Sequence, residues 1–287
     1  MSAVFVMTSS VTSLCSITGM KTVYAIGVDV GGSRIKASAV DTARGALQGE
    51  RHEIDTPQPA TPQAVANAVT QIVAQLLPSP QPPTVSVGIA IPSTIQHQVA
   101  LTAANIDPSW VGVDVSALFH GALSQLELKP DQVSLTVLND ADAAGVAETY
   151  FGRPEARTGN ALLLTFGTGI GSALLRNGVL YPNTELGHLP MPATITSNHT
   201  AEQWASAAAK NRDELNFEDW TTRVDQVLRL YTDLLRPEVF IVGGGISAQA
   251  EQWIPLLDLP VPVVPAELAN DAGIVGAALA VCADVRP

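Results

Sequence analysis

The chain has 287 residues, of which 46% are apolar, so it can bury one large core or the cores of two smaller lobes. Its formal net charge of -12, with only 15 lysines and arginines, argues against a nucleic-acid partner, because binding a phosphate backbone requires a dense basic surface. The two cysteines, Cys15 and Cys282, lie far apart without histidine or cysteine partners at metal-ligand spacing, which argues against disulfides and structural zinc.

The N-terminal segment does not have the features of a targeting or membrane sequence. It lacks the basic start and the sustained apolar stretch of a signal peptide, and no apolar run in the chain reaches the length that spans a bilayer. We therefore expect residues 1–20 to be a disordered extension of a cytoplasmic protein that has no membrane partner.

A strand, a glycine-rich turn and a second strand occur twice along the chain. The first copy comprises residues 23–28, Gly31–Gly32 and 35–40, and the second comprises residues 161–166, the glycines at 167, 169 and 171, and 172–176. Two such units indicate a duplicated domain that closes over one ligand. We place an N-terminal lobe at 21–140 and a C-terminal lobe at 141–287, whose last helix has the option of packing back on the first lobe.

Helices alternate with strands in both halves of the chain. In chain order, the further predicted elements are a helix from Thr61 and Pro62, strands at 85–91 and 134–138, a helix from Asn216 to Pro237, a strand at 239–242, and a last helix over 272–283 capped by Asp271. This alternation indicates α/β lobes with largely buried sheets.

The glycine-rich turns are the candidate phosphate sites, because bare backbone N–H groups can approach phosphate oxygens there. The first turn also has a carboxylate that can hold Mg²⁺ through water. Taken alone, the first turn is more often a hairpin that binds nothing, and the alternative for the second is a β-bulge, but their matching positions favour phosphate binding. The candidates are Asp29, Gly31, Gly32, Ser33 and Lys36 in or beside the first turn, Thr165, Gly167, Thr168 and Gly169 in the second, and Gly243, Gly244 and Gly245 in a third.

Asn139 and Asp140 directly follow a predicted buried strand. A carboxylate held there can accept the proton of a sugar hydroxyl and orient that hydroxyl for phosphoryl transfer, while the amide hydrogen-bonds another hydroxyl. Spacing alone favours a different role for Asp140, as the N-cap of a helix over 141–150, with Asp142 in the first helical turn.

A second group of polar residues suits a polyhydroxy ring. Glu185, His188 and Glu202 supply acceptors and one donor whose charge can switch, and Asn105 is a further candidate. The alternatives are a solvated loop histidine and an asparagine that only forms a turn.

These turns and the Asn139–Asp140 pair, in this order, resemble the ROK family of sugar kinases in the hexokinase and actin superfamily. A narrower resemblance, to the polyphosphate glucokinases within that family, runs from about Val23 to Val281 and rests on the stretches Gly31–Lys36, Leu101–Trp110, Asn139–Glu148, Leu163–Ser172 and Pro182–His188. It implies an α/β, actin-like and ribonuclease H-like fold, duplicated in two lobes, and a homodimer.

The resemblance also implies residue roles. Asp140 is expected to be the catalytic base, and Asn139, Glu185, His188 and Glu202 to hold glucose. The phosphates and Mg²⁺ are expected at Asp29, at the first two glycine turns, and beside Gly243–Gly245. Many ROK members carry a cysteine-rich zinc motif after the Glu-x-Gly-His station, but residues 190–200 contain no cysteine, so we expect no zinc.

One departure from the family pattern concerns the sugar. The family usually has Pro-Gly-Val where this chain has Pro92-Ser93-Thr94. A side chain at Ser93 is expected to crowd the sugar or to alter which hexose fits.

Three functions fit the sequence. The first is a glucokinase that uses polyphosphate, and optionally ATP, in which basic residues line a groove for the polyanion; the candidates are Arg34, Lys36, Arg153, Lys210 and Arg212. The second is an ATP-dependent hexokinase for mannose or fructose. The third is a sugar-sensing regulator without catalysis. The intact Asp140 argues against it, and we do not expect the N-terminal DNA-binding domain that such regulators carry.

Overall fold

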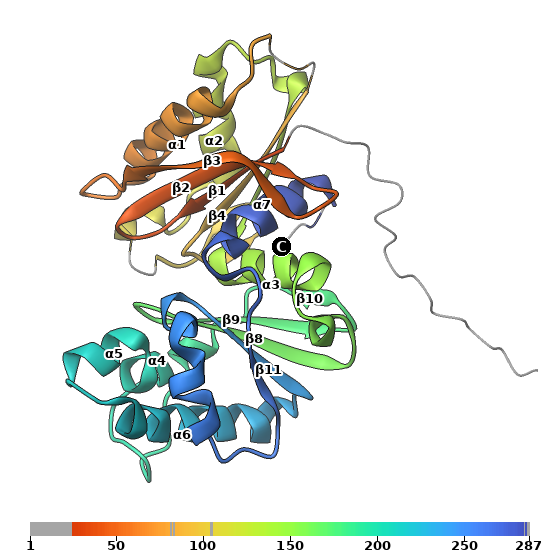
Figure 1. Cartoon of the computed structure of the whole chain (residues 1–287). Coiled ribbons are helices and arrows are strands. Elements are labelled where there is room, and N and C mark those ends of the chain that lie inside the picture. Colours follow the sequence, from red (N-terminus) through yellow and green to blue (C-terminus); the bar gives the residue numbers. More distant parts are fainter. Residues whose placement is uncertain (1–24, 81, 83, 104–105, 284, 286–287) are drawn as a thin grey trace, which may run out of the picture.

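Two five-stranded sheets form the framework of the chain (Figure 1). The computed structural model describes residues 25–80, 82, 84–103, 106–283 and 285, so the expected extension at 1–20 and Asn105 lie outside the described residues. The first sheet has the order β3-β2-β1-β4-β7 and the second the order β10-β9-β8-β11-β12. In both sheets the first three strands are antiparallel and the last three parallel, which is the duplication that the repeated strand–glycine–strand unit predicts.

Seven of the strands lie close to where the sequence predicts them, and the others were not predicted. The first sheet contains β1 (Ala25–Val30), β2 (Arg34–Asp41), β3 (Ala46–Asp55), β4 (Val85–Ile91) and β7 (Val133–Asn139). The second contains β8 (Asn160–Phe166), β9 (Ile170–Arg176), β10 (Val179–Tyr181), β11 (Val239–Gly243) and β12 (Val263–Pro265). A small hairpin, β5 (Ile95–Gln96) and β6 (Val99–Ala100), follows β4.

The helices form three layers around the sheets (Figure 1). They are α1 (Pro62–Leu76), α2 (Val115–Leu123), α3 (Asp140–Phe151), α4 (Ala201–Ala205), α5 (Ala207–Arg212), α6 (Phe217–Leu235) and α7 (Ala272–Cys282). Apolar residues of α1 and α2 form one core with the first sheet, and those of α4 and α6 form another with the second sheet. Helices α3 and α7 lie between the two sheets (Figure 1). No helix among the described residues is long and apolar enough to cross a membrane.

Helix α7 follows the second sheet in sequence but packs on the first. A Cβ atom on Gly27 of β1 would lie 1.9 Å from the carbonyl oxygen of Ile274, and one on Gly88 of β4 would lie 1.8 Å from that of Ala277. Neither strand position can therefore carry a side chain while the helix backbone stays this close. The two glycines let α7 rest directly on β1 and β4, which ties the end of the chain to its beginning.

Of the caps predicted for α1, α6 and α7, two are confirmed and one is wrong. Thr61 accepts a hydrogen bond from the backbone of Ala64, and Asn216 accepts one from the backbone of Asp219. Asp271 does occupy the position before α7, but its side chain makes no capping hydrogen bond. It accepts a hydrogen bond from Arg51 instead, at 3.0 Å, and so joins α7 to β3.

Candidate active site

A cavity of about 240 Å³ lies where the glycine turns of the two sheets face one another. Both β1–β2 and β8–β9 turns contribute to its wall, together with the end of β7 and the segments around Glu185 and Glu202. The predicted site residues that line it are Gly31, Gly32, Ser33, Asn139, Asp140, Thr165, Gly167, Thr168, Gly169, Glu185, His188, Glu202 and Gly244. The structure thus brings together residues that are up to 213 positions apart in the chain, from Gly31 to Gly244.

A few predicted residues do not line the cavity. Asp29 on β1 and Lys36 on β2 are not among the lining residues, and of the third glycine run only Gly244 reaches the wall. Gly243 belongs to β11, while Gly245 begins a 3₁₀ helix, Gly245–Gln252. The position of Asn105 is outside the described residues.

Asn139, and not Asp140, caps helix α3. Its Oδ1 accepts hydrogen bonds from the backbone N–H groups of Ala141 at 2.8 Å and Asp142 at 3.3 Å. The capping role that the spacing suggested for Asp140 is therefore wrong, because the helix begins one residue earlier. Asp140 is its first residue, and its side chain is available to the cavity.

Burial and charge raise the pKa of Asp140 to about 7. Burial is the larger cause, since it penalises the charged carboxylate, and the negative charge of nearby Asp29 adds to it. A carboxylate with a pKa near neutrality can accept a proton from a bound hydroxyl at physiological pH and hold it during reaction. Asp140 therefore has the position and the proton affinity of a general base.

Asp29 is a second half-buried carboxylate, close enough to Asp140 to interact with it electrostatically. Burial raises its pKa, while the positive charges of Lys36 and Arg51 act in the opposite direction. Lys36 pairs with Asp29 across the β1–β2 ladder, so both side chains lie on the same face of the sheet. Two carboxylates that destabilise each other's charge are a donor set that a divalent cation would satisfy.

The β1–β2 turn is held from the side away from the cavity. The hydroxyl of Thr56 donates to the carbonyl oxygen of Gly31 at 2.6 Å, and the side-chain amide of Gln58 donates to that of Gly32 at 3.2 Å. The carbonyl groups of the turn thus have partners within the protein. A turn braced in this way presents a fixed backbone to a phosphate.

The β8–β9 turn passes close to the side chain of Glu202. A Cβ atom on Gly169 would lie 2.4 Å from Oε2 of Glu202. The turn is also fixed by backbone hydrogen bonds from Gly167 to the oxygen of Gly169 and from Ala208 to the oxygen of Gly167, both at 3.0 Å. This rigid turn places the backbone of residues 167–169 and the Glu202 carboxylate side by side on the cavity wall.

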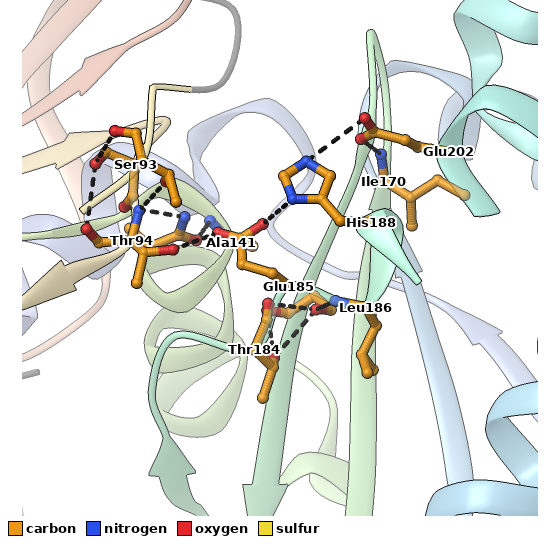
Figure 2. A network of polar contacts seen from close by, with 12 residues as sticks. Ser93, Thr94, Ala141, Ile170, Thr184, Glu185, Leu186, His188 and Glu202 are labelled. Atoms are coloured by element: carbon orange, nitrogen blue, oxygen red, sulfur yellow. Dashed lines mark hydrogen bonds and ion pairs between the residues drawn. The ribbon is translucent and has the colours of Figure 1, made fainter. Parts of the chain in front are cut away.

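His188 lies between two carboxylates (Figure 2). Its Nδ1 is 3.6 Å from Oε2 of Glu185, and its Nε2 is 3.5 Å from Oε1 of Glu202. The other oxygen of Glu202 accepts a long hydrogen bond, 3.4 Å, from the backbone of Ile170. The three side chains form a row of acceptors and donors of the kind that binds neighbouring hydroxyl groups.

Known proteins resemble this chain in sequence and in fold. The ROK family profile matches residues 25–203, which is more than half of the chain. The chain belongs to the ROK family. A polyphosphate glucokinase of Mycobacterium tuberculosis is 45% identical over 261 residues, covering 91% of this chain and 92% of the relative. One from Mycobacterium leprae is 43% identical over 259 residues, covering 90% of this chain and 75% of the relative.

Solved structures of ROK proteins share the fold. The inorganic polyphosphate/ATP-glucomannokinase of Arthrobacter sp. strain KM superimposes with a TM-score of 0.83 at 43% identity, covering 91% of this chain and 99% of that one. A ROK glucokinase from Streptomyces griseus, solved with glucose and AMPPNP, has a TM-score of 0.71 at 23% identity, covering 89% and 98%. The chain therefore has the actin-like, two-lobed α/β fold of ROK sugar kinases, as its sequence predicts.

Ser93 replaces the glycine that is usual in ROK members, and its side chain was expected to crowd the sugar or to alter which hexose fits. Its side chain is buried, and its hydroxyl donates to the carbonyl oxygen of Thr102 at 2.7 Å. The neighbouring Pro92 lines the cavity, whereas Ser93 does not. The expectation that the Ser93 side chain crowds a sugar is therefore not supported by its position.

The sequence did not single out every residue on the cavity wall. Pro92, Ile170, Ser172 and Thr184 also line it. The Ser172 hydroxyl donates to the carbonyl oxygen of Thr184 at 2.6 Å, which fastens the segment before Glu185 to β9. A signal for Ser172 was present, because it is a polar residue in an otherwise apolar strand that leaves a glycine turn.

None of the basic residues expected along a polyanion groove lines the cavity. Arg153 pairs with Glu267 at 3.3 Å, and Arg212 pairs with Asp213 at 2.7 Å. Arg34 makes only long contacts of 3.8 Å to Glu53 and Asp55 and is more than half exposed. Arg34 directly follows the first glycine turn in sequence, and among the described residues its guanidinium makes no closer ion pair than these two contacts. It therefore remains a candidate for binding a polyanion.

Proposed function

We propose that this ROK protein phosphorylates glucose to glucose 6-phosphate, with inorganic polyphosphate as the donor and ATP as a second donor. The observation that carries the proposal is Asp140, a carboxylate with a pKa near neutrality in a cavity walled by two glycine turns. The polyphosphate glucokinases that share 43% and 45% identity with the chain support the choice of sugar and donor.

In the proposed reaction, Asp140 accepts the proton of the glucose 6-hydroxyl as that oxygen attacks the terminal phosphorus of the donor. Asn139, Glu185, His188 and Glu202 bind the remaining hydroxyls, with Asn105 as a further candidate. The glycine turns bind the donor phosphates through backbone N–H groups, and closure of the lobes excludes water, which would otherwise compete as acceptor.

Mg²⁺ is part of this proposal. Among the described residues, no group of three or more histidine, cysteine or acidic side chains is arranged to hold a metal ion by itself. The two mutually destabilised carboxylates, Asp29 and Asp140, nevertheless fit a cation that arrives with the donor, because Mg²⁺ is commonly held by one or two carboxylates, phosphates and water. When bound, the cation neutralises charge on the donor phosphates, with Asp29 holding it through water.

A broader sugar range is a second candidate for the same site. The similar solved structure from Arthrobacter is a glucomannokinase that uses polyphosphate or ATP. Mannose is therefore the first alternative acceptor to test. We also propose a cytoplasmic homodimer, which rests on the family resemblance.

The test is phosphorylation by the purified chain with Mg²⁺, with polyphosphate and ATP supplied in separate reactions and glucose and mannose as acceptors. Faster formation of glucose 6-phosphate with polyphosphate than with ATP would support the proposal. Turnover with ATP alone would instead assign the chain to the ATP-dependent hexokinases. Absence of turnover with both donors, in folded protein that binds glucose, would overturn it. Asp140→Asn is the matched inactive control.

A further inference from the structure

A set of hydrogen bonds joins the hairpin after β4 in the first lobe to the segment before His188 in the second. The side chain of Asn183 accepts a hydrogen bond from the backbone N–H of Ile95 at 2.9 Å and donates one to its carbonyl oxygen at 2.7 Å. One amide side chain thus pairs with both backbone groups of a strand residue. Asn183 is itself fixed, because its backbone N–H donates to the buried carboxylate of Asp142 at 2.8 Å.

Beside this pairing, a single hydroxyl crosses between the lobes to the sugar site. Thr94 donates through its hydroxyl to Oε1 of Glu185 at 2.9 Å, while the other oxygen of Glu185 faces His188 (Figure 2). Thr94 is in turn held by the Thr102 hydroxyl, which accepts a hydrogen bond from its backbone N–H at 2.9 Å. Each oxygen of the Glu185 carboxylate therefore has an assigned neighbour before any ligand is present.

We propose that Thr94 is a positioning residue that orients the Glu185 carboxylate for the sugar. The inference rests on the proposed function, in which Glu185 binds a sugar hydroxyl. A free glutamate loses rotational freedom when a ligand orders it, and this loss weakens binding. A hydrogen bond to an ionised carboxylate is among the stronger ones, so the Thr94 hydroxyl orders Glu185 in advance.

The hydrogen bond from Thr94 to Glu185 also links the two lobes. Thr94 comes from the first lobe and Glu185 from the second, so the sugar-binding carboxylate is oriented only when the two lobes are in the arrangement seen here. Sugar binding and the interlobe arrangement are thereby coupled through one side chain. A substitution at Thr94 should change sugar affinity without touching Asp140 or either glycine turn.

Thr94→Val removes the hydroxyl and keeps the shape of the side chain. We expect the KM for glucose to rise on the order of 10-fold with kcat little changed, because the lost interaction is made in the ground state and the transition state alike. Thr94→Ser, which restores a hydroxyl, should recover most of the affinity. Thr222→Val, an exposed threonine whose hydroxyl bonds only within α6, is the matched control and should behave as wild type.

A panel of monodeoxyglucoses separates positioning from general damage. If Thr94 acts through Glu185, the Thr94→Val effect should shrink for the one deoxy sugar that lacks the hydroxyl bound by Glu185. The double variant Thr94→Val/Glu185→Gln should also lose less than the sum of the two single losses. Equal losses on every sugar, or failure of serine to restore affinity, would overturn the role of Thr94.

Glucose binding by calorimetry distinguishes this failure from a failure of the proposed function. Weaker binding in Glu185→Gln with wild-type binding in Thr94→Val would reject only the inference about Thr94. Wild-type glucose binding in Glu185→Gln would reject the sugar-binding role of Glu185 itself. Circular dichroism of each variant verifies that the fold is retained.

Discussion

At Asp140, a half-buried carboxylate carries an electrostatic cost that the proposed reaction would use. The same burial that raises its pKa to about 7 makes the charged form unfavourable, and the neighbouring charge of Asp29 adds to that cost. Its neighbour Asn139 takes the capping role, and Asp140 accepts one backbone hydrogen bond there, from Ala141 at 2.8 Å. A carboxylate whose pKa is strongly raised by desolvation and a like charge is typical of a reaction centre.

The pH dependence of turnover follows from this pKa. Only deprotonated Asp140 can accept the sugar proton, and because its pKa is raised, the active fraction increases as pH rises through about 7. We expect kcat/KM for glucose to increase roughly 10-fold from pH 6 to pH 8 and then to level off. The measurement is a pH–rate profile with saturating donor.

A matched variant decides which carboxylate is titrating. Asp142, two residues away, is also buried. Its pKa is likewise raised to about 7, mainly because burial penalises the charged form. Asp142→Asn should keep the rise in kcat/KM, whereas Asp140→Asn should lower turnover by on the order of 10²–10⁴-fold and still bind glucose. A flat wild-type profile, or loss of the rise in Asp142→Asn, would contradict the assignment.

At the scale of the elements, the contact between α7 and the first sheet depends on glycine. In Gly88→Ala, the new Cβ would meet the backbone carbonyl of Ala277 at 1.8 Å, and a backbone atom in a packed helix cannot move aside cheaply. We expect a loss of about 1–3 kcal/mol or more in the free energy of unfolding, measured by denaturant titration. Gly121→Ala in α2, where the added Cβ would meet nothing within 4 Å, is the control and should unfold at or slightly above the wild-type midpoint, because alanine is the better helix former.

The elements also show what a sequence can and cannot predict. Short apolar runs and glycine turns predicted seven of the ten strands in the two sheets and the repeat between them, because those signals are local; β3, β10 and β12 were not predicted. The sequence left the placement of α7 open. Gly27 and Gly88 can be identified as the positions where the helix packs only when the position of the helix is known. Similarly, the motifs pointed to Glu185 and His188, but nothing in the local sequence pairs Thr94 with Glu185, 91 residues away.

For the molecule as a whole, α7 decides how independent the two sheets can be. The helix is reached through β12 of the second sheet, yet it packs on β1 and β4 of the first and against α3 between the sheets (Figure 1). Apolar residues of α3 and α7 pack against both sheets in one cluster. If either half unfolded, these residues would lose part of their packing in the other half. We therefore expect the chain to unfold in one cooperative transition despite its two sheets.

Differential scanning calorimetry with and without glucose tests this coupling. A ligand bound between the lobes stabilises both when they unfold together, so at 100 times the dissociation constant glucose should add about 2.7 kcal/mol and shift a single transition upward by several degrees. Galactitol, an open-chain polyol, serves as the control for nonspecific stabilisation by polyhydroxy solutes. Two resolved transitions, of which glucose shifts only one, would show that the lobes unfold separately and that α7 does not bind them into one unit.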